Sequence, residues 1–499
     1  MTGLMEAMAA VKRTENNAYA LSTTFDKLVD FFGVCGALRG RDESDIIKMW
    51  EGAYKENKEL AFRMIFYIRN VRGGLGERSV FRTLLKHVAN KYPKFVKANM
   101  HNISFYGRYD DLLVLFDTPV EDTMIEFIKT SLEDDKSDMA NNLNVSLLAK
   151  WLPSINTSSA KTKELANRLC KSLDMKPAEY RKTLSELRKY INVTEVKMSA
   201  KDWSAIQYEA VPSNSMNKHN KAFRKHDEAR FSEYLDRVNS GEAKINAGVL
   251  YPYDLVKRVW EGKDETAEAQ WKALPDYFEG ITHNALVMAD VSGSMNGQPM
   301  MTSIGLAIYF AEHNTGKFAN SYLTFTDVPK IRVISDNDSL YEKVTDVRRN
   351  GVGYHTDLKK AFMTVLETAK EFNISEEEMP QSIIVISDME INDFGQNTSF
   401  LKHMKSEFEE SGYKLPKLVW CNVNARANTF HAEASDDAQF ISGSSASSFK
   451  SSYLVFCINS ICLGFNLVIA SSKIGPLVSS TKITFLFSNS CKRTATTFK

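Results

Sequence analysis

Residues 284–295 read NALVMADVSGSM, and this stretch decides the fold of the C-terminal half of the chain. An apolar run of strand length ends at Asp290, and a tight turn with Ser292 and Ser294 follows it. A continuous apolar run of this kind is typical of a buried strand in a parallel sheet. Because Asp, Ser and Ser alternate along the turn, three side-chain oxygens can reach one hard cation. The stretch therefore predicts a strand that carries part of a metal site at its carboxyl end.

Two later segments supply further oxygens. The turn GVGYHTD, residues 351–357, places Thr356 at the start of a helical pattern. The run SIIVIS, residues 382–387, is apolar and β-branched and leads into Asp388, so it predicts a second buried parallel strand. In open parallel sheets, ligands gather outside the carboxyl ends of the strands. We therefore expect one site formed by Asp290, Ser292, Ser294, Thr356 and Asp388.

This set of oxygens resembles the metal-ion-dependent adhesion site of von Willebrand factor A domains. The resemblance implies a bound Mg²⁺ or Mn²⁺. Two carboxylates and three hydroxyls leave such an ion incompletely neutralised, so it can accept an acidic group from a protein ligand. The alternative interpretation is that Asp290 caps the following helix and that the serines satisfy backbone donors.

The rest of the C-terminal half alternates between strand and helix patterns, which predicts right-handed crossovers and a parallel sheet. We expect a doubly wound, von Willebrand A-like (Rossmann-type) α/β domain over residues 281–450. Its further predicted helices are 301–312, 356–372 and 397–412, and its further predicted strands are 321–326, 330–335, 417–423 and 438–441.

The first 240 residues show helical periodicity and almost no strand signal. We expect an N-terminal extension over 1–40, an α-helical repeat (solenoid-like) domain over 41–240 and a linker over 241–280, although no clean sequence repeat is present. The predicted helices are 43–54, 59–71, 77–92, 110–116, 121–132, 162–173, 177–191 and 217–238.

Basic side chains gather at two places in this helical half. Residues 61–92 hold seven Arg or Lys against the single acid Glu77, and residues 212–226 (PSNSMNKHNKAFRKH) hold four with no acid. Helical spacing aligns the second group into a stripe that suits phosphates, although most basic runs are solvated helix faces. The candidate RNA-binding residues are Arg72, Arg78, Lys150, Lys218, Lys221, Arg224 and Lys225.

Four phrases carry a resemblance to a family. They are RNVRGGLGER at 69–78, GRYDDL at 107–112, KWLPS at 150–154 and SDME at 387–390. They look like those of an uncharacterised Ro-like (TROVE-like) family with a C-terminal von Willebrand A-like domain, over roughly residues 40 to 450. The resemblance implies a scaffold that binds structured non-coding RNA. Read locally, the glycines of the first phrase could cradle a phosphate or form a plain interhelical turn, and Trp151 could stack a base or be buried.

Composition limits the other partners and the compartment. The chain has 499 residues, 43% of them hydrophobic and 25% charged, and a net charge of +1, which suggests a soluble protein with no overall attraction to nucleic acid or membrane. Cys35, Cys170 and Cys421 are isolated and predict packing thiols in a reducing compartment. The N-terminal residues lack the apolar core of a signal peptide, so we expect a cytoplasmic (intracellular) protein.

Residues 451–499 form an atypical apolar, Ser-rich tail, and no Asp or Glu occurs after Asp437. Three interpretations are a membrane anchor, an apolar completion of the preceding domain, and the product of a shifted reading frame. The abrupt loss of acids favours the last.

The resemblance, together with the basic helical half, implies a non-enzymatic RNA-binding scaffold of the Ro-like type with a Mg²⁺-dependent adhesion site in its C-terminal half. The alternative function is a metal-dependent protein–protein interaction scaffold without RNA. We name no catalytic residue, because the sequence has no Walker-type loop, Cys-His pair or nucleophile elbow. A metal-dependent hydrolase stays as a third interpretation, with Glu390 and Asp393 as the additional acids to examine near Asp388.

Overall fold

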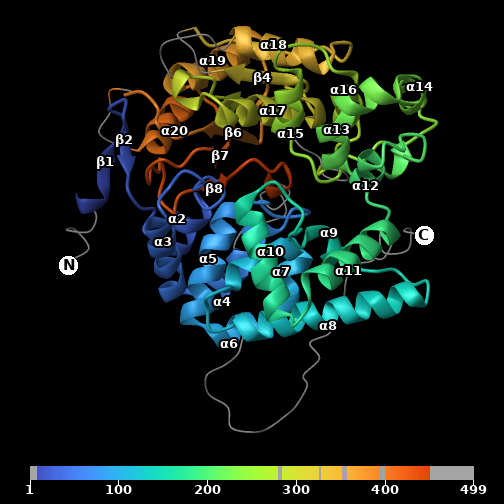
Figure 1. Cartoon of the computed structure of the whole chain (residues 1–499). Coiled ribbons are helices and arrows are strands. Elements are labelled where there is room, and N and C mark those ends of the chain that lie inside the picture. The colour runs from blue at the N-terminus through green and yellow to red at the C-terminus, as the bar shows by residue number, and fades with distance from the viewer. Residues whose placement is uncertain are drawn as a thin grey trace.

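The computed structural model describes residues 8–278, 284–324, 328–350, 357–393, 395 and 399–449. Thr356 and the tail over 451–499 lie outside the described residues. Figure 1 shows two parts, with the sheet and its helices above and the helices of residues 43–190 below; α13 (Ser213–His226) and α14 (Glu228–Asn239) lie with the upper part. The predicted combination of a helical half and a mostly parallel sheet is confirmed.

The sheet has six strands in the order β5-β4-β3-β6-β7-β8, and all neighbours are parallel except β4 and β5. Chain order therefore runs outward in both directions from β3 and β6, as in a doubly wound sheet, whose ligand crevice lies at this switch point. The strands are β3 (Ala285–Ala289), β4 (Ser321–Thr324), β5 (Ile331–Val333), β6 (Ser382–Ser387), β7 (Lys417–Asn422) and β8 (Ala438–Ser442).

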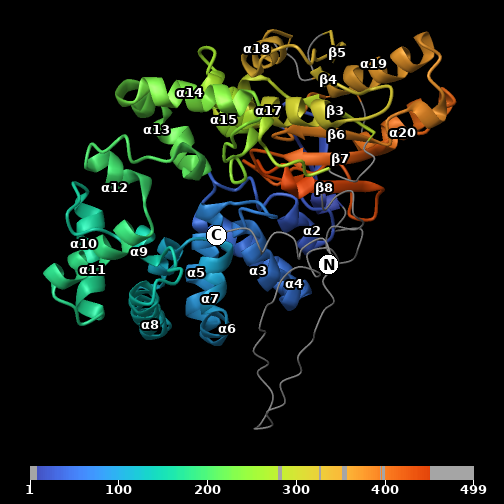
Figure 2. The same ribbon diagram turned by 90° about the vertical axis from the view of Figure 1, so that its right-hand side faces the viewer.

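Helices cover both faces of this sheet, which explains why every residue of β3 and β6 is buried. In Figure 2, α15 and α17 lie on one side of the strands and α19 and α20 on the other. At Gly305 of α17, an added Cβ would lie 3.0 Å from the backbone of Pro252, so glycine lets α15 and α17 approach closely. These helices are α15 (Pro252–Val259), α16 (Glu265–Lys272), α17 (Gln298–His313), α18 (Leu340–Asn350), α19 (Leu358–Glu371) and α20 (Phe400–Glu410).

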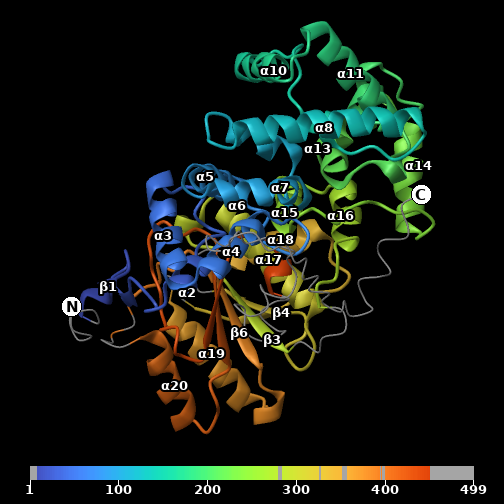
Figure 3. The ribbon, with the colours of Figure 1, turned by 90° about the horizontal axis from the view of Figure 1, so that it is seen from below.

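The helical half begins with α3, α4 and α5, which pack through an aromatic cluster that includes Trp50, Phe62 and Tyr92. Seen from below, α8 lies between the α5–α7 group and the pair α10 and α11 (Figure 3). The repeat arrangement stays a prediction. The helices are α2 (Lys27–Phe32), α3 (Glu43–Glu56), α4 (Lys58–Arg69), α5 (Arg78–Lys91), α6 (Pro93–Ala98), α7 (Met100–Tyr106), α8 (Glu121–Ala140), α9 (Leu148–Trp151), α10 (Ala160–Ser172), α11 (Pro177–Tyr190), α12 (Thr194–Ser199), α13 (Ser213–His226) and α14 (Glu228–Asn239).

Two helix predictions are corrected by the structure. The single helix predicted over 217–238 is wrong, because the chain breaks at Asp227, whose φ is −150°. The Asp227 carboxylate accepts the Tyr208 hydroxyl at 2.7 Å and pairs with Arg230, and these contacts hold the break. The segment predicted as a helix over 110–116 forms the 3₁₀ helix η1 (Tyr109–Leu115).

An N-terminal hairpin of β1 (Val11–Arg13) and β2 (Tyr19–Leu21) was not predicted, because its strands are too short to show alternation. It lies beside the sheet part, where Leu21 and Phe430 exchange two backbone hydrogen bonds of 2.9 Å. Next along the chain, α2 packs on β8. At Gly36 an added Cβ would lie 2.5 Å from the carbonyl oxygen of Ser442, so only glycine fits this junction.

None of the described helices combines the length and the apolarity that a membrane crossing requires.

Candidate metal centre and cationic surfaces

Asp290 follows β3 directly and is 1% exposed. Its Oδ1 accepts the backbone N–H of Ser292 at 2.9 Å, and its Oδ2 accepts the hydroxyl of Ser387 at 2.7 Å. The 3₁₀ helix η3 (Gly293–Met295) comes next, and it brings the Ser292 and Ser294 hydroxyls within 3.2 Å of each other. The turn therefore gathers the oxygens that its alternating spacing predicted.

Asp388 follows β6 and lies beside Asp290, because β3 and β6 pair in parallel up to Ala289 and Ile386. Its Oδ1 accepts the N–H of Glu390 at 3.1 Å. Its Oδ2 accepts a hydrogen bond from Nη2 of Arg426 at 2.8 Å, and this arginine lies in the loop after β7. The two carboxylates thus meet at the switch point of the sheet.

Burial and the charge of Asp388 raise the pKa of Asp290 to about 6. Two buried carboxylates next to each other disfavour the ionised form, and a cation between them would relieve this cost. Desolvation lowers the pKa of Arg426, but the charges of Asp388 and Glu15 outweigh it and raise that pKa overall. The site therefore has a negative potential that draws positive charge.

The donor set fits a hard divalent cation. Carboxylate and hydroxyl oxygens are the ligands that Mg²⁺ and Mn²⁺ take in proteins. Asp290, Asp388, Ser292 and Ser294 provide them in the described residues, while the fifth predicted ligand, Thr356, is not described. No group of three His, Cys, Asp or Glu within the described ranges is arranged to hold a metal, and the predicted set contains only two such side chains.

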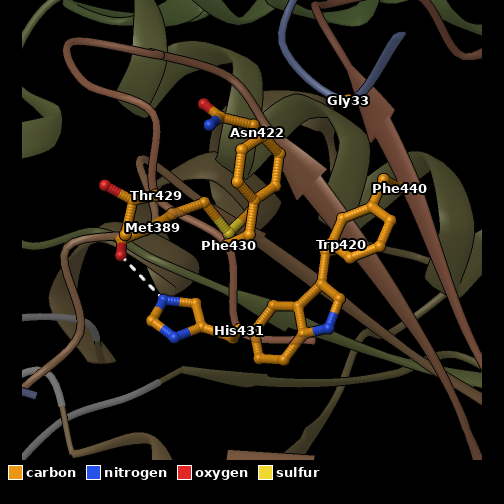
Figure 4. Close-up of a pocket in the computed structure, with 8 residues that line it drawn as sticks. All are labelled: Gly33, Met389, Trp420, Asn422, Thr429, Phe430, His431 and Phe440. Carbon is orange, nitrogen blue, oxygen red and sulfur yellow. Dashed lines mark hydrogen bonds between the residues drawn. The ribbon is translucent and has the colours of Figure 1, made fainter. Parts of the chain in front are cut away.

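The residue after Asp388 is held in an uncommon conformation. Met389 has a φ of +68°, a region that side chains other than glycine seldom adopt. The buried ring of His431 binds the Met389 carbonyl oxygen through Nε2 at 2.9 Å, and burial lowers the pKa of this histidine. Figure 4 shows this contact at the edge of a small pocket that Trp420 and Phe430 also line. The packing behind Met389 thus fixes the turn that presents Asp388.

Neither additional acid joins the two carboxylates. The Glu390 carboxylate accepts the N–H of Glu15 at 2.7 Å and the hydroxyl of Thr429 at 2.8 Å. Asp393 is exposed and accepts the N–H of Gly395 at 3.0 Å. Both acids therefore hold the loop that follows β6.

The α13 surface carries three of the predicted RNA-binding side chains. Lys218, Lys221 and Lys225 are exposed at helical spacing, and among the described residues none of them forms an ion pair. Arg224 points elsewhere, since it pairs with Glu265 at 2.8 Å and lies over the Phe231 ring. We call the three lysines the α13 lysine stripe.

A second cationic surface involves the start of α5, the residue before η1 and the end of α9. Arg78 is exposed and has no carboxylate partner in the described part of the chain. Burial and the charges of Arg108 and Arg82 lower its pKa, so like charges crowd there. The Arg108 guanidinium lies 4.0 Å from the centre of the half-buried Trp151 ring, and Lys150 Nζ lies 5.6 Å from it. The structure thus places the predicted Lys150, together with Arg108, at one aromatic side chain, and the charge of Arg108 also acts on the predicted Arg78.

Arg72 lies on the neighbouring loop, where it donates to the carbonyl oxygen of Phe105 at 3.2 Å. The Phe105 side chain is 63% exposed, an unusual state for so large an apolar group. We call Arg72, Arg78, Phe105, Lys150 and Trp151 the arginine–aromatic surface.

The glycine phrase between α4 and α5 is an interhelical turn. The N–H groups of Gly74 and Gly76 both donate to the Asn70 carbonyl, and that of Leu75 donates to Tyr67. These amides are therefore not available to a phosphate. An added Cβ on Gly74 would lie 2.2 Å from the Tyr67 carbonyl oxygen, which explains the glycine at this position.

Sequence reasoning missed three participants at the candidate metal centre. Ser387 was visible as the neighbour of Asp388, and a hydroxyl next to a predicted ligand is a usable signal. Arg426 and Glu15 gave no local signal, because they reach the site only through the loop after β7 and the N-terminal hairpin.

The fold and these sites define a protein of two parts, a helical half with cationic surfaces and a doubly wound sheet with paired acids at its switch point. Residues 284–454 match the model of a domain of unknown function, DUF7788, and residues 14–127 and 175–279 match that of another, DUF2828. The chain is 27% identical over 462 residues to an uncharacterized protein of Acanthamoeba polyphaga mimivirus, covering 83% of this chain and 79% of that protein.

Among solved structures, the crystal structure of the Ro (RSR) protein of Deinococcus radiodurans aligns with 88% of this chain and 99% of its own, at 12% identity and a TM-score of 0.38. A TM-score this low does not carry the fold or the function of that protein to this chain.

Proposed function

We propose that this protein is an RNA-binding scaffold of the Ro-like type, which binds structured RNA through its helical half. The α13 lysine stripe is the observation that carries the proposal. Three exposed ammonium groups on one helix face have no carboxylate to neutralise them within the described residues, so they are free to meet phosphates. The near-neutral net charge of +1 makes such local surfaces decisive, since the whole molecule does not attract nucleic acid.

The arginine–aromatic surface supports the same proposal. Exposed aromatic rings beside cations suit RNA, because bases stack on rings and on guanidinium planes while phosphates pair with the charges. The exposed Phe105 and the half-buried Trp151 supply the rings, and Arg72, Arg78 and Lys150 supply the charges.

The test is a titration of structured RNA with a single-stranded end, at several salt concentrations. We expect tight binding with a steep salt dependence for the natural protein. Lys218→Ala/Lys221→Ala/Lys225→Ala should weaken binding at least about tenfold and lower the slope of log K against log salt by about 2 to 3, near 0.9 per lost phosphate contact. Fluorescence anisotropy measures both quantities.

The matched control is Lys360→Ala/Lys402→Ala/Lys405→Ala, which removes three exposed ammonium groups from α19 and α20. RNA affinity should change little in this variant. Equal losses in the two triple variants would show that only overall charge matters, and absence of RNA binding by the natural protein would reject the proposed function.

The second part of the proposal is a Mg²⁺ or Mn²⁺ held by Asp290, Ser292, Ser294, Thr356 and Asp388. The charge repulsion between the two buried carboxylates supports it, as does the cluster of hydroxyls beside them. When bound, the ion would supply a coordination position for an acidic group of a protein ligand.

That chemistry also favours the alternative function, a metal-dependent protein interaction scaffold without RNA. The alternative predicts that a protein partner is released by chelation of divalent ions and retained after RNase treatment. We take the site as one for binding; metal-dependent phosphodiester cleavage that disappears in Asp388→Ala would instead identify a hydrolase.

A further inference from the structure

Arg426 contacts the candidate metal centre from outside the predicted ligand set. Its Nη2 lies 2.8 Å from Oδ2 of Asp388, and its Nη1 lies 3.1 Å from Oε2 of Glu15. The side chain of Asp388 is 1% exposed, whereas those of Arg426 and Glu15 are 39% and 59% exposed. The guanidinium therefore joins a buried carboxylate to one that faces solvent.

We propose that Arg426 is a tethered cation that competes with a divalent ion for Asp388, and that Glu15 retains the guanidinium when the ion is bound. This inference rests on the metal site of the proposed function. An ion that coordinated Oδ2 of Asp388 would share that oxygen with the guanidinium, and two cations at such close range in a poorly hydrated site repel each other strongly. Arg426 therefore sets how tightly the site binds metal.

The surroundings of Arg426 allow it to move. Arg69 provides a comparison within the molecule. Its side chain is 4% exposed and pairs with the fully buried Asp111, so the Arg69 guanidinium cannot move to solvent. Arg426 lies at the rim of its site and already contacts a second carboxylate. A shift of the guanidinium toward Glu15 would leave its charge paired and hydrated, which keeps the cost of release small.

Glu15 is held in place without help from Arg426. It lies in the turn between β1 and β2, and its backbone N–H donates to the Glu390 carboxylate at 2.7 Å. The neighbouring Asn16 donates its side-chain amide to the Glu390 carbonyl at 2.6 Å, and the Thr14 hydroxyl donates to the Ile391 carbonyl at 2.8 Å. The N-terminal hairpin thus fixes the alternative acceptor next to the loop that carries Asp388.

The experiment measures Mn²⁺ binding to the full chain by calorimetry and by electron paramagnetic resonance. Arg426→Gln should bind Mn²⁺ about tenfold more tightly than the natural protein, because the competing charge is gone while one buried carboxylate still needs a cation. Glu15→Gln should bind it more weakly. In the Arg426→Gln background the Glu15→Gln change should have little effect, since Glu15 acts through Arg426.

Two controls separate this role from general electrostatics and from folding. Lys402→Gln removes an exposed cation that pairs with Glu433, a residue of the loop that also carries Arg426, and should leave Mn²⁺ affinity unchanged. Arg426→Lys keeps the charge and should stay close to the natural protein. In EDTA the thermal midpoint of Arg426→Gln should fall, and saturating Mn²⁺ should raise it by more than in the natural protein. If Arg426→Gln fails to fold, weaker Mn²⁺ binding by Glu15→Gln together with nearly unchanged binding by Arg426→Lys still supports the proposal, and unchanged binding by Glu15→Gln overturns it.

Each outcome bears on a different claim. Mn²⁺ binding that is equal or weaker in Arg426→Gln overturns the competition while the metal site stands. Mn²⁺ binding by Arg426→Gln but not by the natural protein supports the competition most strongly, because Arg426 then excludes the ion completely. Absence in both overturns the metal site and this inference together.

Discussion

Asp290→Asn is expected to weaken Mn²⁺ binding at least about 100-fold, because loss of a direct ligand should exceed the 10–100-fold effect of outer-shell partners. The substitution keeps the shape of the side chain and an oxygen for the Ser292 N–H, but it removes one of the two carboxylate charges at the switch point. Calorimetry with the natural protein as reference measures the change.

The same substitution should not destabilise the metal-free protein at neutral pH. Burial and the neighbouring Asp388 disfavour the charged form of Asp290, so a neutral amide removes an unfavourable interaction from the folded state. We expect a thermal midpoint in EDTA at least equal to that of the natural protein. Loss of metal binding without loss of stability would show that Asp290 serves binding and not folding.

The control is Asp393→Asn, an exposed acid in the loop after β6, which also carries Asp388; this change should leave the affinity unchanged. Mn²⁺ affinity of Asp290→Asn within a factor of about three of the natural value, an energy close to RT, would refute the predicted ligand set.

Asp111→Ala is expected to destabilise the helical half by about 3–5 kcal/mol, the usual cost of leaving one member of a buried ion pair alone. Asp111 is 0% exposed and Arg69 is 3% exposed, and their side chains meet at 2.7 Å. Asp111 also accepts Nε of Arg82 at 2.6 Å and the N–H of Arg108 at 3.0 Å. Arginine stays charged in proteins, so in Asp111→Ala the buried Arg69 cannot avoid the cost of an unpaired charge by losing its proton.

Urea unfolding followed by circular dichroism measures this effect. The control is Asp117→Asn, which removes the charge from a pair that makes two contacts with Arg168, at 2.7 and 2.8 Å. Asparagine tolerates the φ of +60° at this position, so the substitution adds no backbone strain. The Asp117 side chain is 72% exposed, so solvent replaces the lost partner and the unfolding midpoint should hardly move. Equal effects of the two substitutions would mean that burial does not set the strength of these pairs.

Loss of stability in Asp111→Ala also bears on RNA binding. One connected set of ion pairs reaches the arginine–aromatic surface through Arg108; its members are Arg69, Asp111, Arg82, Asp110 and Arg108. The set holds Arg108 against Trp151, so the acids position this surface while Arg78 stays unpaired in the described part of the chain.

Local sequence patterns predicted the strands and the acidic side chains that follow them at the candidate metal centre. The apolar runs before Asp290 and Asp388 predicted β3 and β6, because a strand covered on both faces has to be apolar along its whole length. Their placement side by side follows from parallel pairing, which aligns carboxyl ends. In the N-terminal half, helical periodicity predicted α3, α4, α5, α10 and α11 closely. The short helices α6, α7, α9 and α12 were not predicted, α8 continues past its predicted end at residue 132, and side-chain contacts at Asp227 break another predicted helix.

What the sequence by itself determined is therefore the local part: which segments are helices or strands, and which oxygens stand at strand ends. Only the tertiary structure decided the partners of charged groups, because an ion pair depends on where distant loops meet. Hydrogen-bonded partners lie far apart in the sequence: Arg426 and Asp388 are separated by 38 residues, Glu15 and Glu390 by 375, and Arg224 and Glu265 by 41. Hydrophobic periodicity cannot predict these contacts, because it reflects which side of one helix or strand is buried and not which elements lie next to each other.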